Sequence, residues 1–397
     1  MMQQRIAVVG GGMGGLTAGS LLQQAGFDVT VYEQARQLSR IGAGINIYPN
    51  GMHVLRATGV VEDLLTLGQV PDTWYSRMWD TGEILYSQPQ QQWHRQYGEP
   101  HAILHRGDLQ GALAQRLRPG SVQFEKKLIG IEEASDALTL RFEDGTTAQV
   151  DAIIGADGVN SRVRELLLGP QQPKYSGFVA YRSVFPTSRL SRPLDSDGAK
   201  FWSDDRHWAN EDRHMIIYYT TKAKDEVYFV TGSPDPDWEG ASPVDVTIKE
   251  VKEHYAGFHE QVQDVIDASI SISKWPLLTR DPLPLWSSGR VVLLGDACHP
   301  MKPHMGQGAG MAFEDAAVLT RCLQTHPDNF PAAFKLYETN RHERASKVQR
   351  ISNANTFLKY EEDPTWCFGY NAMTVPLHTD EQALGEPRSE LREQGAS

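Results

Sequence analysis

The feature that most constrains the fold lies near the start of the chain, where residues 5–33 combine a strand, a glycine-rich turn, a helix and a second strand. Residues 5–9 are apolar and β-branched, residues 16–26 repeat apolar side chains at helical spacing, and residues 27–33 alternate before ending on Glu33. Gly10, Gly12 and Gly15 have the GxGxxG spacing, which permits a tight turn, close approach of backbone to a pyrophosphate, and packing of helix on strand. The segment predicts a Rossmann-like unit that binds a dinucleotide, with Glu33 accepting hydrogen bonds from ribose. The alternative is a glycine turn that binds nothing.

Two later segments have the form of strands that end in Gly and Asp. They are residues 151–158 (DAIIGADG) and 290–297 (RVVLLGDA), which place Asp157 and Asp296 at strand ends. Parallel strands that end this way face a shared crevice at the carboxyl edge of a sheet. Taken singly, each acid is equally well explained as a capping residue in a turn.

Residues 175–232 differ in character, because aromatic and β-branched side chains alternate there with polar ones. This pattern predicts antiparallel strands, which we expect to form a second layer over the substrate. Residues 243–268 and 307–358 have helical patterns, and the polar stretch from about residue 384 predicts a frayed tail.

Composition excludes several classes of function. The net charge of -12 leaves no overall basic surface for nucleic acid, and no apolar run approaches the roughly 20 residues that span a bilayer. The first residues run directly into a strand without the pattern of a secretory signal, so a cytoplasmic protein is expected. Three cysteines without paired spacing predict neither a disulfide framework nor a metal site.

GADGVNSRVR (155–164) and LLGDACHP (293–300), together with the first glycine turn, resemble the signatures of the class A flavoprotein aromatic hydroxylases. The resemblance covers nearly the whole chain, including residues 212–221, 271–286 and 353–366, and is strongest to family members that act on hydroxypyridine carboxylates. It implies FAD as cofactor, with NADH and O₂ as co-substrates. It also implies a Rossmann-like FAD-binding fold (α/β) with an inserted, mostly antiparallel β-sheet substrate domain and C-terminal helices.

The resemblance also implies a division into domains. We expect a discontinuous FAD-binding domain at 1–75, 101–172 and 274–350, a substrate domain at 76–100 and 173–273, and a C-terminal helical segment and tail at 351–397. The oligomeric state is left open between monomer and homodimer.

Family roles carried over by position give a set of FAD contacts. By these roles, Asp296 contacts the ribityl chain of the flavin, Leu128 packs on the adenosine, and Arg106 pairs with the pyrophosphate or a ribityl oxygen. A glycine-rich helix start can direct backbone N–H groups at the flavin ring. The full expected set is Gly10, Gly12, Gly14, Gly15, Glu33, Gln34, Arg106, Leu128, Asp157, Asp296, Ala309 and Gly310.

The implied reaction is hydroxylation of a hydroxylated aromatic or pyridine carboxylate through a flavin C4a-hydroperoxide, with possible decarboxylation. Such a reaction needs a proton acceptor near the ring hydroxyl and a dry apolar pocket. By position, Tyr218 and His304 are the expected catalytic contacts, although Tyr218 is as well explained by a core role. The expected substrate-binding residues are His214, Ile216, Val230, Thr231 and Gly232.

The chain departs from the family pattern at Asn46, where the most similar family members have a histidine assigned as proton acceptor. Asparagine does not titrate in the working range, but it can orient a substrate by hydrogen bonding, so Asn46 stays among the expected catalytic residues. Residues 204–214, which repeat a DRH element, are a second departure and resemble a short insertion. The alternatives are an FAD-dependent dehydrogenase or reductase without oxygen insertion and, more remotely, a flavin-binding module without activity.

Overall fold

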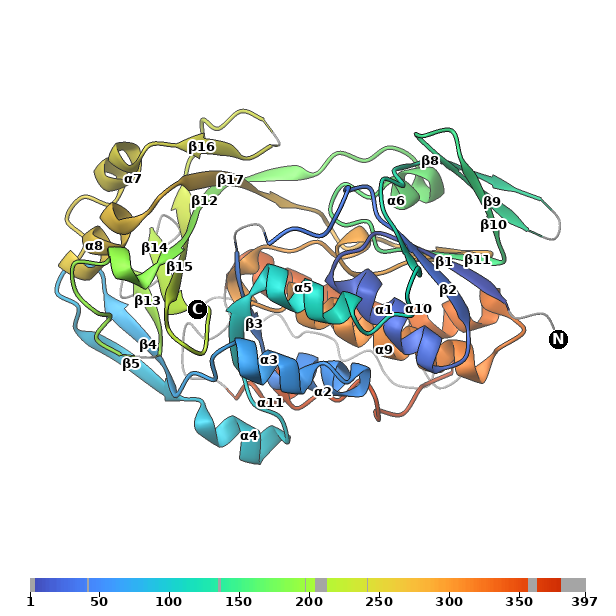
Figure 1. Cartoon of the computed structure of the whole chain (residues 1–397), viewed down its shortest axis with the longest axis horizontal. Coiled ribbons are helices and arrows are strands. Elements are labelled where there is room, and N and C mark those ends of the chain that lie inside the picture. Colours follow the sequence, from blue (N-terminus) through green and yellow to red (C-terminus); the bar gives the residue numbers. More distant parts are fainter. Residues whose placement is uncertain are drawn as a thin grey trace, which may run out of the picture.

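The computed structural model describes residues 4–40, 43–134, 137–196, 198–203, 213–240, 242–355 and 363–379. One of the two halves of the molecule in space is built on a six-stranded sheet (Figure 1). In spatial order its strands are β18 (Ser287–Ser288), β19 (Val291–Leu293), β11 (Ala152–Gly155), β1 (Arg5–Val9), β2 (Asp28–Tyr32) and β7 (Val122–Gln123). All pairs except β18–β19 are parallel. The three predicted strand ends, after β1, β11 and β19, therefore meet at one edge of one sheet.

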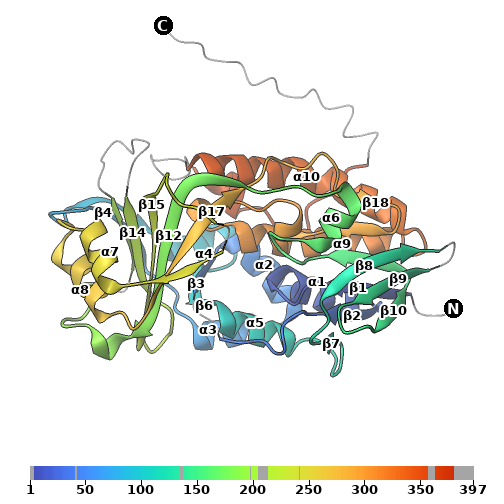
Figure 2. The same cartoon turned by 90° about the horizontal axis from the view of Figure 1, so that it is seen from above.

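Helices cover one side of this sheet. The helix α1 (Met13–Gln24) packs on β1 and β2 and against α9 (Gly308–Thr325), which in turn packs against α10 (Phe330–Ala354) (Figure 2). A small antiparallel sheet lies on the other side, where Phe142 contacts the ring of Tyr32 with the ring centroids 4.8 Å apart. It comprises β8 (Leu128–Glu133), β9 (Leu138–Phe142) and β10 (Thr147–Val150).

The second half of the molecule is an eight-stranded sheet. Its strands, in spatial order, are β16 (Val244–Val246), β17 (Ile272–Thr279), β12 (Lys174–Pro186), β15 (Glu226–Pro234), β14 (His214–Tyr219), β13 (Ala199–Ser203), β4 (Thr73–Met78) and β5 (Ile84–Pro89). Every pair is antiparallel except β13–β4, which confirms the predicted antiparallel layer. On one face, Val251, Tyr255, Val262 and Val265 of the next two helices pack on Met215 and Phe229. These helices are α7 (Ile248–His254) and α8 (Glu260–Ala268).

Short elements join the two halves. Of these, the two-stranded sheet of β3 (Gly44–Ile47) and β6 (Ala102–His105) lies between the halves. The remaining helices are α2 (Pro49–Thr58), α3 (Val61–Leu67), α4 (Gln91–Tyr97), α5 (Arg106–Ala114), α6 (Arg162–Leu168) and α11 (Thr365–Phe368). Three single turns of 3-10 helix, η1 (Thr187–Arg189), η2 (Gly295–Ala297) and η3 (Pro303–Met305), complete the elements.

Both predicted helical stretches are interrupted. Residues 243–268 contain β16 before α7, and α7 and α8 are separated around Gly257, whose φ of +86° no helix accommodates. The described part of 307–358 forms two helices, because α9 ends at Thr325 and Asn329 and Pro331 start α10. The expected insertion at 204–214 falls mostly outside the described residues, as does the frayed tail. If domains follow the sheets, their boundaries lie nearer residues 73 and 279, but the division into domains stays a prediction.

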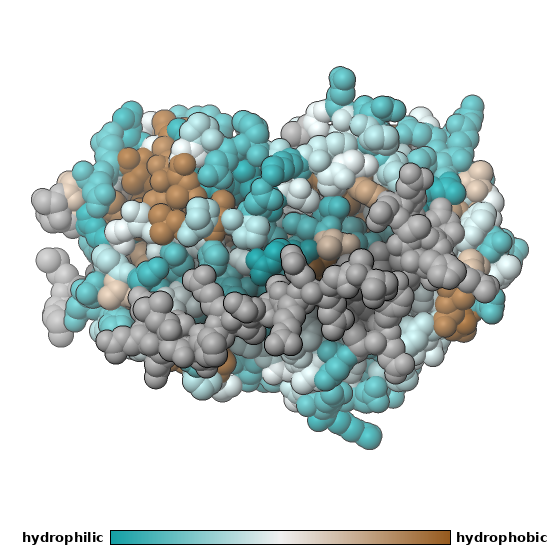
Figure 3. All heavy atoms as spheres, turned by 180° about the vertical axis from the view of Figure 1, so that it is seen from behind, coloured by the Kyte–Doolittle hydropathy of each residue, from teal (hydrophilic) through white to brown (hydrophobic). Residues whose placement is uncertain are grey.

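The surface agrees with the acidic, polar composition. The face in Figure 3 is largely hydrophilic, with apolar side chains gathered mainly in one area. Within the described part of the chain, no helix is both long enough and apolar enough to cross a membrane.

Candidate active site

The glycine turn after β1 has the geometry that the spacing predicts. Gly10 has φ of +109°, and a Cβ there would lie 2.3 Å from the carbonyl oxygen of Ala156. A Cβ on Gly15 would lie 2.0 Å from the carbonyl oxygen of Gly10, so helix and turn are in direct contact. Gly12 differs, because no described heavy atom lies within 4 Å of its Cβ position, at the N-terminus of α1. The open space beside these N–H groups fits a pyrophosphate.

Glu33 is held in place at the end of β2. Its Oε2 accepts the N–H of Gly11 at 2.7 Å and its Oε1 accepts the N–H of Ala35 at 2.8 Å. A carboxylate has about four acceptor sites, so these bonds orient the group and leave capacity for ribose hydroxyls. Gln34 follows it and is exposed.

The side chains of Asp296 and Arg106 lie close enough for their charges to act on each other. Asp296 lies in η2 directly after the strand β19, and Arg106 is the first residue of α5. Both side chains are exposed, yet loss of hydration raises the pKa of Asp296 and lowers that of Arg106, and each charge partly opposes the other's shift. An exposed side chain loses hydration in this way when neighbouring protein atoms exclude water from part of its surroundings. This is the geometry expected of residues that contact a bound cofactor.

Asp157 has a different environment, since its carboxylate caps α6. It accepts the N–H groups of Arg162 at 2.7 Å and Val163 at 3.0 Å and the hydroxyl of Ser161. Arg164 then ties this segment to η2 by donating to the carbonyl oxygen of Ala297 at 2.8 Å. The two later motifs are thus linked to each other through an arginine.

The N-terminus of α9 provides a second cradle. Its N-cap residue Gln307 is 1 % exposed, and its Nε2 has no hydrogen-bond partner among the described residues. No described heavy atom lies within 4 Å of a Cβ placed on Gly308, whereas one placed on Gly310 would meet Gln307 Oε1 at 2.8 Å. A buried amide donor beside open space, with Ala309 partly exposed, suits the polar edge of a flavin ring.

Gly14 and Leu128 lie apart from these cradles. A Cβ on Gly14 would lie 2.6 Å from a methyl group of Leu294, so this glycine permits close contact between α1 and the chain before η2. Leu128 is buried at the start of β8.

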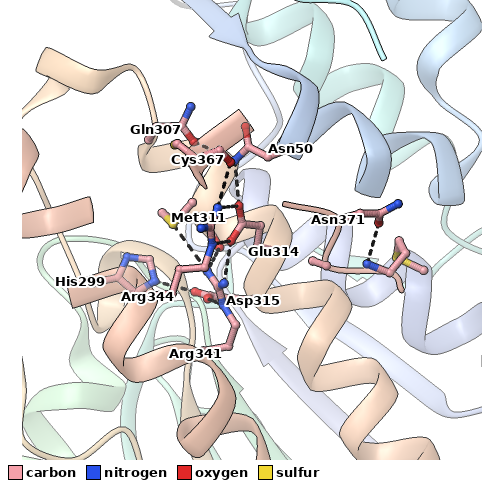
Figure 4. Close-up of polar contacts among 12 residues, drawn as sticks. Asn50, His299, Gln307, Met311, Glu314, Asp315, Arg341, Arg344, Cys367 and Asn371 are labelled. Atoms are coloured by element: carbon pink, nitrogen blue, oxygen red, sulfur yellow. Dashed lines mark hydrogen bonds and ion pairs between the residues drawn. The ribbon is translucent and has the colours of Figure 1, made fainter. Parts of the chain in front are cut away.

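Buried charges hold the α9 cradle from behind (Figure 4). Arg341 of α10 donates to Glu314 at 2.6 Å and to Asp315 at 2.8 Å, and all three side chains are fully buried. Asp315 also accepts the N–H of Gly295, which fixes η2, and Glu314 accepts from Asn50 at 2.8 Å. Burial is the largest single influence on the pKa of Asp315 and by itself raises it. The attraction of His299 and Arg341 together outweighs burial and lowers this pKa to about 2. This network positions the helix start and the Asp296 turn together.

The substrate residues expected on β14 and β15 share one face of the eight-stranded sheet, with one exception. His214 pairs with Gly232, Ile216 with Val230, and Tyr218 with Tyr228, and directly paired residues point to the same side. Thr231 alternates with them and lies on the opposite face. There its hydroxyl accepts the N–H of Tyr181 at 2.9 Å, so the structure does not bring its side chain together with the others.

His304 approaches this face from η3. Its ring makes an edge contact with His214, with the centroids 5.8 Å apart, and a Cβ on Gly232 would lie 2.1 Å from the His214 ring. The Nδ1 of His304 faces the carbonyl oxygen of Ser352 at 3.1 Å and must donate to it. In the neutral ring, Nε2 is then the atom with the lone pair, as a proton acceptor requires.

Asn46 meets Tyr218 on the same side. Burial raises the pKa of Tyr218 well above its ordinary value, so the phenol stays protonated, and the Asn46 side chain acts on that pKa in the opposite sense as a hydrogen-bond partner. A Cβ on Gly44 would lie 2.7 Å from the Tyr218 hydroxyl, which explains why β3 has glycine there. The predicted residues thus form two pairs on this face of β14, His214 with His304 near the start of the strand and Asn46 with Tyr218 near its end.

Arg182 is a site residue that the sequence patterns did not reveal. It pairs with Val230 across β12 and β15, so it lies on the face that carries Tyr218. Its charge lowers the pKa of Tyr218 and of Tyr228, and its buried Nε has no hydrogen-bond partner in the described part of the structure. The available signal was an arginine within the apolar strand VAYRSVF.

Comparisons with known proteins agree with this geometry. A family model described as an FAD-binding domain matches residues 3–352. The 6-hydroxynicotinate 3-monooxygenases of Pseudomonas fluorescens and Bordetella bronchiseptica are each 50 % identical, covering 94 % of this chain and 96 % and 97 % of theirs.

Solved structures show the same fold. HpxO of Klebsiella pneumoniae complexed with FAD and uric acid has a TM-score of 0.80 and 27 % identity, covering 91 % of this chain and 90 % of that one. A salicylate hydroxylase substrate complex has a TM-score of 0.78 and 26 % identity, covering 93 % and 96 %. The predicted fold class and cofactor are confirmed, and the chain belongs to the FAD-binding family of class A flavoprotein aromatic monooxygenases.

Proposed function

We propose that this protein uses NADH and O₂ to hydroxylate a ring-hydroxylated pyridine or benzene carboxylate, with 6-hydroxynicotinate as the first candidate and loss of the carboxyl group as CO₂. The observation that carries the proposal is that one face of the eight-stranded sheet carries the phenol of Tyr218 and the guanidinium of Arg182 and is approached by the histidine His304. Similarity to two 6-hydroxynicotinate 3-monooxygenases supports the choice of ring.

Each side chain has a chemical task in this proposal. Bound FAD, once reduced, supplies the activated oxygen that is transferred to the ring. The Nε2 of His304 accepts the proton of the ring hydroxyl, which raises the electron density of the ring. The guanidinium of Arg182 pairs with the carboxylate of the substrate. Ile216 and Val230 provide apolar walls that exclude water.

The cofactor residues divide into two groups. Gly10, Gly12 and Glu33 would hold the ADP part, whereas Asp296, Arg106 and the start of α9 would hold the ribityl chain and ring. Gly14, Leu128 and Asp157 would act mainly by packing and capping around these contacts. These assignments rest on the contacts described above.

A substrate screen with the purified holoenzyme tests the proposal. NADH oxidation and oxygen uptake are measured with 6-hydroxynicotinate, 3-hydroxybenzoate and salicylate, and the products are identified by mass. Ligand-stimulated oxygen uptake with a hydroxylated product supports a monooxygenase, and product mass separates simple hydroxylation from hydroxylation with loss of CO₂. NADH oxidation that neither consumes O₂ nor yields a hydroxylated product would establish the dehydrogenase alternative.

A further inference from the structure

A buried chain of polar side chains runs away from the site behind Tyr218. Asn46 Oδ1 lies 3.1 Å from Nε2 of His101, and the Nδ1 of the same ring lies 2.8 Å from Oε1 of Gln90. His101 is 1 % exposed and Gln90 is 3 % exposed. The ring of His101 stacks on that of Tyr48 with centroids 4.5 Å apart. These residues come from three separate segments, and none of them takes part in the chemistry proposed above except through Tyr218.

The protonation of His101 decides how this chain is oriented. An amide oxygen faces each ring nitrogen, so both nitrogens would have to carry a proton and the ring would be an imidazolium ion. Burial, however, lowers the pKa of His101 to about 3. The ring is therefore neutral at working pH, and one of the two amides must be turned.

Turning the Gln90 amide is the better solution. Its Nε2, which has no partner among the described residues, then donates to Nδ1 of His101 and is satisfied. If Asn46 were turned instead, the buried N–H₂ group of Gln90 would stay without an acceptor. Unsatisfied donors are rarer than under-used carbonyl oxygens. In the favoured arrangement, Nε2–H of His101 donates to Asn46 Oδ1, and the N–H₂ group of Asn46 donates to the oxygen of Tyr218.

This direction determines what Tyr218 offers to a ligand. An oxygen that already accepts from Asn46 directs its own proton elsewhere. We propose that His101 is a positioning residue that, through Asn46, holds Tyr218 as a hydrogen-bond donor to the ring oxygen of the substrate after that oxygen has lost its proton. The inference rests on the proposed function and extends it, since it specifies the ionised form of the ring that the site binds.

Ligand binding to the holoenzyme provides the main test. Dissociation constants are measured from the change in the flavin absorption spectrum, with 6-hydroxynicotinate as ligand and nicotinate as the analogue without the ring oxygen. In His101→Phe the Asn46 amide can turn and accept the Tyr218 proton. Affinity for 6-hydroxynicotinate should fall about five-fold, the equivalent of one net hydrogen bond, while affinity for nicotinate changes less than about two-fold. An equal loss for both ligands, or no loss, would overturn the proposal.

Further variants separate positioning from packing. His101→Gln retains an N–H donor near the Nε2 position and should restore most of the affinity. In a Tyr218→Phe background, His101→Phe should have almost no further effect, because the two residues act in series. His53→Phe is the matched control. His53 is a partly buried histidine that hydrogen-bonds the carbonyl oxygen of Tyr97 and, among the described residues, makes no hydrogen bond to Asn46, His101 or Gln90. A full additive effect in the double variant would contradict the proposal.

The tautomer of His101 can be read without any ligand. In protein labelled with ¹⁵N-histidine, long-range ¹H–¹⁵N correlations assigned by comparison with His101→Gln should show the Nε2–H tautomer. The Nδ1–H tautomer would overturn the inference. If wild-type protein binds neither acid, the proposed function and the choice of ligand fail, and the tautomer alone decides whether His101 orients Asn46.

Discussion

Removing the titratable group at position 101 should make folding less sensitive to acid. The pKa of His101 falls from 6.5 to about 3 on burial, so between these values the unfolded chain binds a proton that the folded protein does not. Stability therefore falls as pH drops through 6.5 and continues to fall until the folded pKa is reached. One pKa unit corresponds to about 1.4 kcal/mol, so His101 alone costs about 2 kcal/mol at about pH 5 and only about 0.2 kcal/mol at about pH 7.

The assay compares wild type with His101→Gln by urea unfolding at about pH 5 and about pH 7. The phenol that stacks on His101 does not titrate in this interval, because burial raises the pKa of Tyr48. All other carboxyl and histidine groups are common to both proteins and cancel in the difference. Wild type should lose about 2 kcal/mol more than the variant between the two pH values. Equal losses in the two proteins would refute the burial argument, and a larger loss in the variant would reverse its sign.

Three further predictions concern the cofactor half. Gly12→Val should lower the flavin content of purified protein, measured as the ratio of flavin to protein absorbance, with little change in apo-protein melting, because a Cβ at Gly12 meets no atom within 4 Å; Gly111→Ala, whose Cβ position in α5 is also unobstructed, is the control. Asp296→Asn should weaken FAD binding, measured by flavin fluorescence on dilution, and retained stoichiometric tight binding would contradict the assigned contact. Arg341→Met should destabilise the fold by about 3–5 kcal/mol in chemical unfolding, since it removes the arginine shared by two fully buried carboxylates and leaves Glu314 with Arg344 and Asp315 with His299 as partners; a loss below about 1 kcal/mol would contradict that account.

The parallel sheet and its glycine turn were predictable because their signals are local. Gly10, Gly12, Gly15 and Glu33 lie within one β-α-β unit, and the strand ends before Asp157 and Asp296 follow the same rule. The helix breaks near Gly257 and Pro331 had local signals as well, which the helical periodicity obscured.

The site was less predictable because its contacts join distant segments. Nothing in the sequence indicates that His101 meets Asn46, 55 residues earlier, or that Arg182 faces Tyr218. Strand alternation could have separated Thr231 from Val230 and Gly232, since neighbouring residues point to opposite faces. Asn46 was noted as a departure from the family pattern, but the reason that an amide suits this position lies in the histidine behind it.

The buried carboxylates of α9 set a lower limit on the size of any self-sufficient cofactor-binding fragment. Glu314 and Asp315 stand directly behind the cradle, but their arginine partner comes from α10, across a turn and after every strand of the six-stranded sheet is complete. A chain that stopped at the end of α9 would contain the whole glycine fingerprint and both acidic turns. It would still lack Arg341 and Arg344, which would leave Glu314 without an arginine and Asp315 with His299 alone, so we expect the cradle to become rigid during synthesis only after α10 has been made.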